Sequence, residues 1–423
     1  MSETTRRGFT SAAGLEVVIA DRIHRGWREA SIEVGIEAVA GKMELKLAER
    51  WAGEDKPRLI LPGQAFKATL DGEIVIEGFI EAVDPEYDET DHVLTITGRE
   101  RTQDLVDCAA VLDGPHEWKN IKLDEACRRI CAPYGILVEA QCDVGAVFPR
   151  FSIEPGEAAW DTIERHCRQR AVLATGNGRG TLLITRSGLG GTGAGPIQLG
   201  GPEGNIRKAK GVFDWSQRHH LVVVRGQAQG GKVDGEGLYD VTNERKPVLV
   251  ERHGTGPKAA QGTLRGQGRA RDAEIGRYRP KVIIAETQGG GASFQERAEW
   301  DVRVAAGRSR RPTYTVPGWR GSTGALWRPN TMVPVADAYL DVREELLVAG
   351  VKWAVTQDGS LTELQVTRKD AFARIAEPAS NQGQGKKKGG GLMGGEGDFY
   401  EDDRGRFVRL KPGEQPPPGR SKP

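Results

Sequence analysis

The sequence predicts a mainly β protein with an α+β insert. We expect two related antiparallel β-barrel-like domains, a small α/β domain between them and a disordered C-terminal tail. Three observations lead to this prediction. Apolar and polar residues alternate at period two in both halves of the chain, as in strands, and helical spacing is confined to the middle. One segment also occurs twice, about 270 residues apart, which indicates an internal duplication.

The repeated segment covers a long strand and the start of the next one. Glu73-Ile-Val-Ile-Glu-Gly-Phe-Ile-Glu-Ala-Val83 matches Glu345-Leu-Leu-Val-Ala-Gly-Val-Lys-Trp-Ala-Val355, with a glycine at the sixth position of each. Both copies continue through a polar loop into a second strand, which begins at Leu94 in one copy and Leu364 in the other. Two amphipathic hairpins can also resemble one another by chance, so the duplication is a hypothesis for the structure to test.

The domain bounds follow from the changes in patterning and composition. We expect a flexible arm (1–13), a first β-barrel-like domain (14–106), a small α/β domain (107–205), a second β-barrel-like domain in two pieces (206–250 and 298–372), an insertion within it (251–297) and a Gly/Pro/Lys-rich flexible tail (373–423). The tail has too little apolar surface to bury.

The first β-domain is indicated by three short alternating runs, at 15–19, 31–35 and 43–47. Asp71-Gly72 then separates two strand-like runs and is the dipeptide typical of a type I′ hairpin turn. Alternation of this kind predicts an antiparallel sheet with one face buried and one face in water.

The α/β domain is indicated by helical spacing. Apolar residues recur at one face of a predicted helix that ends at Pro133 and Gly135, and they are Leu123, Ala126, Cys127, Ile130 and Cys131. A second helix is expected over about 157–171, followed by a strand at 182–185.

The second β-domain begins with strands at 211–215 and 221–225 and is interrupted by an Arg- and Gly-rich insertion. Within the insertion, 281–285 is a candidate strand. The β pattern returns through 317–335 and continues to Phe372.

Composition narrows the class of protein. The chain has 423 residues, which is too long for one ordinary domain, and a net charge of +1, which argues against a protein that coats nucleic acid. No stretch approaches the roughly 18 apolar residues that cross a bilayer, so we expect no stable membrane insertion. The five cysteines suit free thiols in a reducing compartment.

No motif carries convincing chemistry, so we expect no catalytic, cofactor-binding or metal-ligating residues. Gly188–Gly193 matches the pattern GxGxxG, but Pro196 follows where a phosphate-binding helix would have to begin, and we interpret the segment as a flexible linker. His166, His219 and His220 lack the base and orienting partners of a nucleophilic site, and we expect them to be surface or partly buried polar residues.

Four residues are candidate subunit or partner contacts: Trp319, Arg320, Trp327 and Arg328. Tryptophan and arginine are enriched at the energetic centres of protein interfaces, although core packing explains each tryptophan equally well. A second basic group could contact an acidic surface, and we favour a solvated or subunit-contacting role for it; its members are Arg265, Arg269, Arg271, Arg277, Arg279, Arg308, Arg310 and Arg311.

Several strings resemble the phage Mu-like baseplate hub protein family (tail protein P). They are Thr97-Gly-Arg-Glu-Arg-Thr-Gln-Asp-Leu-Val-Asp-Cys-Ala-Ala110, Trp118-Lys-Asn120, Ile130-Cys-Ala-Pro-Tyr-Gly135, Phe148-Pro, Tyr314-Thr-Val-Pro-Gly-Trp319 and Leu326-Trp-Arg-Pro-Asn330. The resemblance spans about 15–372 and leaves the tail outside it.

The resemblance implies a structural virion protein and no enzyme. Such a hub is a homotrimer whose paired β-domains form a pseudo-sixfold ring in a contractile-tail baseplate. It joins the tail tube protein to a trimeric cell-puncturing spike, contacts other baseplate proteins and leaves a lumen for the tape-measure protein and DNA. Assembly would take place in the host cytoplasm.

Two alternatives remain at this point. A tail-associated peptidoglycan hydrolase would need a pair of carboxylates or a metal cluster. The hub half of a secretion-system spike protein would continue into a repetitive β-helical spike, whereas this sequence ends in a Gly- and Pro-rich stretch.

Overall fold

The computed structural model describes residues 14–24, 27–48, 60–88, 92–227, 264–285, 294–356, 359–374, 399–401 and 407–409. The chain divides into two units, residues 1–378 and 379–423. The expected arm (1–13), part of the expected insertion (251–263 and 286–293) and most of the expected tail lie outside the described residues.

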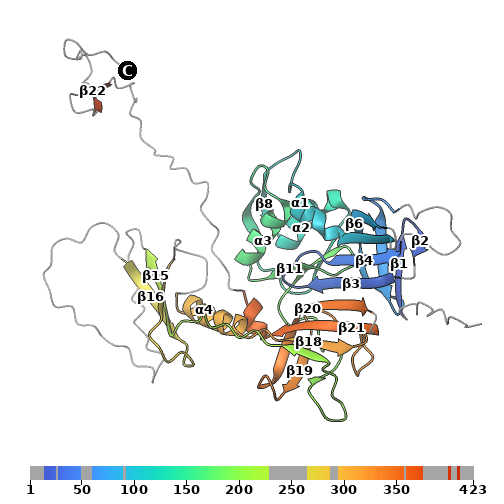
Figure 1. The fold of residues 1–423 in the computed structure, drawn as a ribbon. Helices are drawn as coiled ribbons and strands as arrows, with labels where there is room; N and C mark the ends of the chain where they lie inside the picture. Colours follow the sequence, from blue (N-terminus) through green and yellow to red (C-terminus); the bar gives the residue numbers. More distant parts are fainter. Residues whose placement is uncertain are drawn as a thin grey trace, which may run out of the picture. The chain divides into compact units, whose positions relative to one another are not determined.

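The first β-domain is an antiparallel sheet in the order β3-β4-β7-β6-β5-β1-β2 (Figure 1). Its strands are β1 (Leu15–Ile19), β2 (Arg22–His24), β3 (Trp27–Gly35), β4 (Lys42–Ala48), β5 (Ala65–Leu70), β6 (Glu73–Tyr87) and β7 (His92–Glu100). Alternate residues of β1 are buried, as its period-two pattern predicts, and Asp71 and Gly72 form the turn between β5 and β6 with positive φ angles.

The α/β domain contains the two predicted helices. Its elements are α1 (Asp104–Asp107), β8 (Glu117–Ile121), α2 (Leu123–Cys131), β9 (Leu137–Ala140), β10 (Phe148–Ser152), α3 (Ala159–Gln169), β11 (Leu173–Gly176) and β12 (Thr181–Thr185), with short 3-10 turns at Arg101–Gln103 and Ala132–Tyr134. All five residues on the predicted apolar face of α2 are buried, and α2 and α3 pack into one hydrophobic core. The helix ends where Gly135 takes a left-handed conformation.

The second β-domain is also antiparallel apart from one edge, where β13 runs parallel to β19. Its elements are β13 (Ile197–Gln198), β14 (Lys208–Lys210), β18 (Thr313–Pro317), β19 (Met332–Asp337), β20 (Val342–Thr356), β21 (Gly359–Thr367) and a 3-10 turn at Lys369–Phe372. The order along the sheet is β14-β18-β21-β20, with β19 beside β20.

A separate three-stranded sheet corrects the expected boundary of the insertion. It contains β15 (Leu221–Gln227), β16 (Leu264–Arg271) and β17 (Pro280–Ala285), with β15 in the centre. The sequence pattern assigns 221–225 to the second β-domain, and this assignment is wrong: β15 pairs with β16 and β17 and with no other described strand. The candidate strand at 281–285 is confirmed as β17.

Helix α4 (Phe294–Arg308) was not predicted, because 298–372 was expected to be β. The helix covers one face of the three-stranded sheet, where Ala298 packs against Val222 and Val224 (Figure 1). Its helical signal is weak in sequence because only three of its residues are fully buried and Gly307 is one of them. A β-carbon at Gly307 would lie 2.5 Å from the Ala371 amide nitrogen, so glycine permits close contact there.

The C-terminal unit is not wholly irregular in the part that the structure describes. β22 (Phe399–Glu401) and β23 (Phe407–Arg409) form an antiparallel pair, within a region that we had expected to lack structure. The buried Ala371 and Phe372 also pack within the first unit, in contact with Leu347, so the body extends to the end of this turn.

The two β-domains share one strand order, which supports the duplication. The order β3-β4-β7-β6-β5-β1 corresponds to β14-β18-β21-β20-β19-β13, although β1 runs antiparallel to β5 whereas β13 runs parallel to β19. The aligned strands β6 and β20 occupy the same place in this order. The predicted alignment of the second strands, β7 and β21, was wrong in register. Gly78 lies opposite Glu100 and Gly350 lies opposite Gln365, so Gln365 corresponds to Glu100 in the structure. The sequence match aligns Gln365 with Thr95 instead.

Candidate functional site: the junctions around the first β-domain

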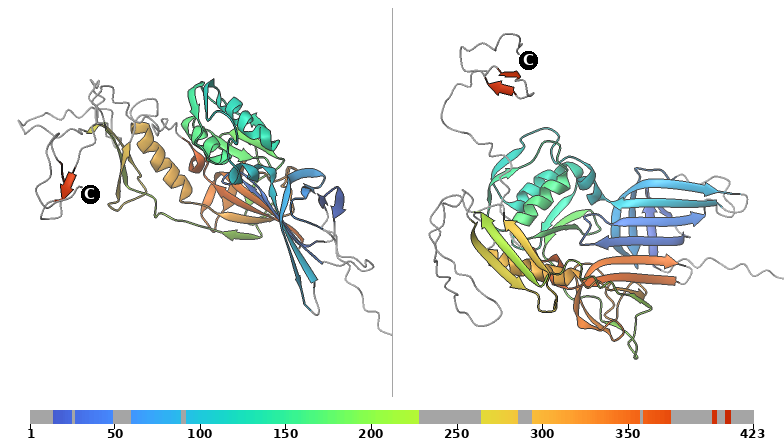
Figure 2. Two further views of the ribbon diagram at one scale, coloured as in Figure 1. Left: turned by 90° about the horizontal axis from the view of Figure 1, so that it is seen from above. Right: turned by 60° about the vertical axis from the view of Figure 1, so that its left-hand side comes forward.

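The two β-domains join edge to edge through β3 and β20, which makes one continuous sheet (Figure 2). The pairing runs from Gly35 opposite Gly350 to Ala30 opposite Val355, and Ile32 lies opposite Trp353. Both central side chains are almost completely buried in a hydrophobic core that contains residues of both domains. Because this core is shared, the two β-domains are held as one body by apolar burial as well as by backbone hydrogen bonds.

The four predicted contact residues lie at this junction within the chain. Trp319 and Trp327 are buried in the shared core, which is the alternative that the sequence left open. Arg320 and Arg328 reach the turn between β5 and β6, where both form ion pairs with Glu73 at 2.8 and 3.1 Å. Arg320 also contacts Asp71 at 3.1 Å.

These ion pairs have a modest energetic effect. Hydrogen bonding from Arg320, followed by Arg328, lowers the pKa of the Glu73 carboxyl. The Glu73 side chain remains 44% exposed, so water screens the attraction. The arginines therefore add a screened, weakly stabilising contact at the turn, whereas Trp319 and Trp327 contribute by apolar burial within the shared core.

Glu100 joins the first β-domain to the α/β domain, and the sequence analysis did not identify it. The residue is 2% exposed, and its carboxylate accepts hydrogen bonds from the backbone N–H groups of Gly41 and Gly178, both at 2.9 Å. Burial raises the pKa of this carboxyl to about 7, and the backbone hydrogen bonds oppose the rise. Alternation along β7 could have revealed it, since Glu100 shares the buried face of Leu94 and Ile96.

The turn that holds Glu100 depends on close backbone contact. Gly178 has a φ of +79° and a β-carbon there would lie 2.2 Å from the Val75 carbonyl oxygen. The Glu77 N–H donates to the Gly178 carbonyl at 2.7 Å, and the Gly176 N–H donates to that of Val39 at 2.9 Å. The α/β domain is thus fixed to the first β-domain through its β11–β12 turn.

Glycines 188–193 form no phosphate-binding loop. The Gly188 N–H donates to the Asn330 side chain at 2.7 Å, and the Gly193 N–H donates to the Met332 carbonyl at 2.8 Å. No helix comes directly after this segment; the next described element is the short strand β13. The expected flexible linker is therefore bound along β19, because its backbone donors find carbonyl and amide acceptors there.

His166 and His220 also make packing and hydrogen-bond contacts within the fold. His166 is buried, stacks on Phe151 at 3.6 Å between ring centroids, and has its pKa lowered to about 4 by burial. Our expectation of a surface or partly buried residue was wrong here, because α3 turns this position into the core. His220 accepts a hydrogen bond from the Arg279 N–H.

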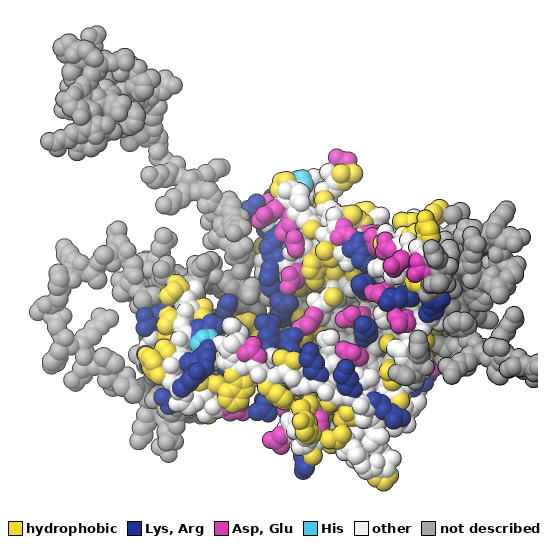
Figure 3. Space-filling view, in the orientation of Figure 1, with side chains coloured by type: hydrophobic (Ala, Val, Ile, Leu, Met, Phe, Trp, Pro, Cys, Tyr) yellow, Lys and Arg dark blue, Asp and Glu magenta, His cyan; other side chains and the backbone are white. Residues whose placement is uncertain are grey.

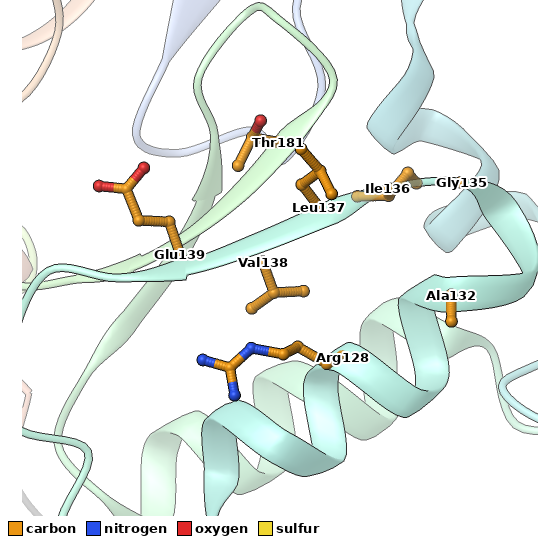
Figure 4. A pocket seen from close by; sticks show the side chains of 8 residues that line it. All are labelled: Arg128, Ala132, Gly135, Ile136, Leu137, Val138, Glu139 and Thr181. Atoms are coloured by element: carbon orange, nitrogen blue, oxygen red, sulfur yellow. The ribbon is translucent and has the colours of Figure 1, made fainter.

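The described residues contain no group of three or more His, Cys, Asp or Glu side chains arranged to hold a metal ion. Among the described helices, none combines the length and apolar character needed to cross a bilayer. A pocket of about 580 Å³ lies between α2 and β9 and has a largely apolar lining (Figure 4). Its charged residues are Arg128 and Glu139, and Arg128 is paired with Asp124 at 2.9 Å.

The predicted basic group is divided among several contacts. Arg311 pairs with Glu37 at 2.8 Å, and Arg308 donates to the Ala371 carbonyl at 3.1 Å. The side chains of Arg269, Arg271 and Arg277 are exposed, and the side chain of Arg265 lies outside the described residues. Positive and negative side chains are interleaved over much of the face in Figure 3.

Comparison with known proteins agrees with this architecture. Residues 14–100 match the model of the Mu phage baseplate assembly protein GpP-like N-terminal domain, 102–186 the second domain of baseplate hub protein gp44-like, and 290–375 the fourth domain of GpP. Baseplate hub protein gp44 of Escherichia phage Mu is 30% identical over 401 residues, 94% of this chain and 96% of that protein. The chain belongs to the Mu phage baseplate hub protein family.

Solved structures show the same fold. The 43 kDa tail protein of prophage MuSo2 from Shewanella oneidensis is 30% identical, with a TM-score of 0.69 over 85% of this chain and 99% of that one. The tail protein from Neisseria meningitidis MC58 is 19% identical, with a TM-score of 0.66 over the same shares. A structural role in a phage tail baseplate follows for this baseplate hub protein.

Proposed function

We propose that this hub protein forms a homotrimer at the centre of a contractile-tail baseplate and joins a sixfold tail tube to a threefold spike. The observation that carries the proposal is the shared strand order of the two β-domains, together with their edge-to-edge pairing through β3 and β20. Three such chains present six similar modules around an axis. Each sixfold-related partner then meets a nearly equivalent surface.

The ring would have two different sides. One would contact the tail tube protein and the other the trimeric spike and further baseplate proteins, with a lumen through which the tape-measure protein and DNA pass. The α/β domain and the three-stranded sheet do not resemble each other. They would therefore reduce the approximate sixfold symmetry of the ring to threefold and would suit contacts with threefold partners. The assembled protein would reside in the virion tail baseplate after assembly in the host cytoplasm.

The oligomeric state tests this function directly. Light scattering coupled to size exclusion should give three times the chain mass of 46.0 kDa, and electron micrographs should show rings with six lobes. Obligate interfaces of this kind are large, so the trimer should persist at micromolar concentration. A strictly monomeric protein at that concentration would contradict the proposal, and clearing in a peptidoglycan zymogram would favour the hydrolase instead.

A further inference from the structure

The three-stranded sheet has one face covered by α4. Val222 and Val224 of β15 point towards this helix and pack against Ala298. No other described helix or strand makes an extensive contact with β15, β16 or β17. Figure 2 (right) shows the three strands in front of α4, with their other face turned to the viewer. Among the described residues, this second face therefore has no partner.

The second face, which we call the open face, takes alternate residues from Leu221–Arg225, Gln267–Arg271 and Pro280–Ile284. Residues directly opposite one another in a sheet point to the same side. Val223 lies opposite Val282, so both point away from α4. Each strand contributes three residues to the open face, which gives it a flat surface three strands wide.

Aliphatic side chains form a stripe along β15 and β17 on the open face. They are Leu221, Val223, Pro280, Val282 and Ile284. Val282 is 52% exposed and Ile284 is 47% exposed, whereas Val223 between its neighbours is buried. Adjacent branched side chains that remain half exposed favour association, because covering them removes apolar surface from water.

Three arginines lie beside this stripe. Arg225 comes from β15, and Arg269 and Arg271 come from β16. Arg269 and Arg271 are exposed, and none of the three forms an ion pair with a described residue. No position of the open face is acidic. Unpaired positive charges next to an aliphatic stripe favour a partner that is both acidic and apolar.

The covered face shows how a helix meets this sheet. Lys281 of β17 forms an ion pair with Asp301 of α4 at 2.7 Å, beside the apolar contacts of Ala298. A basic residue of the sheet thus meets an acidic residue of the helix. Three strands about 4.8 Å apart make a surface roughly as wide as one helix, which is about 10–12 Å across. The open face therefore suits one further helix, since sheets are commonly covered by helices on both faces.

Nucleic acid also attracts arginines, but the open face fits it less well. Single strands stack their bases on aromatic side chains, and no position of the open face is aromatic. Duplex DNA is held chiefly by contacts with phosphates, which leave an aliphatic stripe uncovered. The half-exposed Val282 and Ile284 therefore favour a protein partner.

We propose that the open face binds an acidic amphipathic helix of another baseplate protein. The apolar side of that helix would cover Val282 and Ile284, and carboxylates along one flank would pair with Arg269 and Arg271. The proposal rests on the baseplate role of the chain and does not depend on the trimer. It names the chemistry of one of the baseplate partners.

Two synthetic peptides test this chemistry on the purified full chain. The probe is an amphipathic peptide of about 15 residues with leucines on one face and glutamates along one flank, and its control has lysine in place of each glutamate. By fluorescence anisotropy, the glutamate peptide should bind at least about tenfold more tightly than the lysine peptide. Arg269→Glu with Arg271→Glu should weaken its binding by about tenfold or more, and Val282→Ser with Ile284→Ser by about fivefold or more. Equal binding of both peptides, or an unchanged affinity in either double variant, overturns the proposal.

Matched controls separate the open face from general charge effects. Lys208→Glu with Lys210→Glu reverses two exposed lysines of β14 and should change the affinity by less than about twofold. Should the charge-reversed arginine pair fail to fold, Arg269→Gln with Arg271→Gln makes the same comparison. A DNA duplex of about 20 base pairs that binds more tightly than the glutamate peptide, and that only the arginine changes weaken, would make the face a nucleic-acid site and contradict the proposal.

Photo-crosslinking identifies the partner in assembled tails. The full chain, with p-benzoylphenylalanine in place of Val282, is produced in cells that also make the other tail proteins. We expect a cross-link to an acidic, amphipathic helical segment of a different polypeptide, and its loss when Arg269→Glu and Arg271→Glu are added. A cross-link only to this protein's own sequence or to DNA, or no cross-link, defeats the proposal. A purified protein that is monomeric defeats the trimer proposed above and leaves this proposal standing.

Discussion

Replacing Glu100 should loosen the α/β domain from the first β-domain. The Glu100→Ala variant leaves the N–H groups of Gly41 and Gly178 buried without an acceptor. An unsatisfied buried donor costs about 1–3 kcal/mol, so the free energy of unfolding should fall by about 2–5 kcal/mol. Glu100→Gln is milder, since its side-chain oxygen still accepts one of the two hydrogen bonds while its NH₂ group faces the other donor.

The Glu100→Gln variant also isolates a pH effect. The folded-state pKa of Glu100 is about 7, above the ordinary value of 4.5, because burial penalises the charge. The folded protein therefore binds this proton more tightly than the unfolded chain does. The resulting stabilisation is complete below pH 4.5 and is lost as the pH rises to 7, by about 3 kcal/mol.

Urea unfolding of both proteins at several pH values between 4.5 and 8 measures this difference. The unfolding free energy of the wild type minus that of Glu100→Gln should decrease by about 3 kcal/mol across the range. For Glu139→Gln, which changes an exposed carboxylate, the difference in unfolding free energy from the wild type should stay constant across the pH range. A constant difference between wild type and Glu100→Gln would show that the carboxyl titrates alike in both states, and the argument from burial would fail.

Three further changes probe the junctions by thermal unfolding. Gly178→Ala should destabilise by more than about 2 kcal/mol, since it adds a clash with the Val75 carbonyl to the strain of a positive φ, whereas Gly72→Ala, with a φ of +82° and open space, should cost about 1–2 kcal/mol. Equal costs would contradict the contact. Trp327→Ala removes a side chain that is 1% exposed and should cost about 3–5 kcal/mol; a loss below 1 kcal/mol would place it outside the core. Arg320→Ala should lower the melting temperature much less than Trp327→Ala does, and a loss of stability that is the same in low and high salt would mean that its ion pairs are not the cause.

Period-two alternation was a good guide where one face of a strand is buried and the other is wet. It located most strands of the first β-domain, and helical spacing located α2 and α3, because each of these elements has a distinct apolar face. The run Leu221–Val224 was harder to place, since its continuous apolar character fits any buried strand. Its true partners come after a long polar segment, so nothing local connects β15 with β16.

The repeat also shows that a sequence match does not fix the register of strand pairing. The shared glycine motif correctly paired β6 with β20, yet it misaligned the strands that follow. β6 continues to Tyr87 before its turn, whereas β20 ends at Thr356, only one residue beyond the matched segment. A hairpin fixes register through its loop length, and the two loops differ. Glu100 was missed for another reason: alternation along β7 can mark it as buried, but the Gly41 and Gly178 N–H groups that donate to its carboxylate come from segments far apart in sequence.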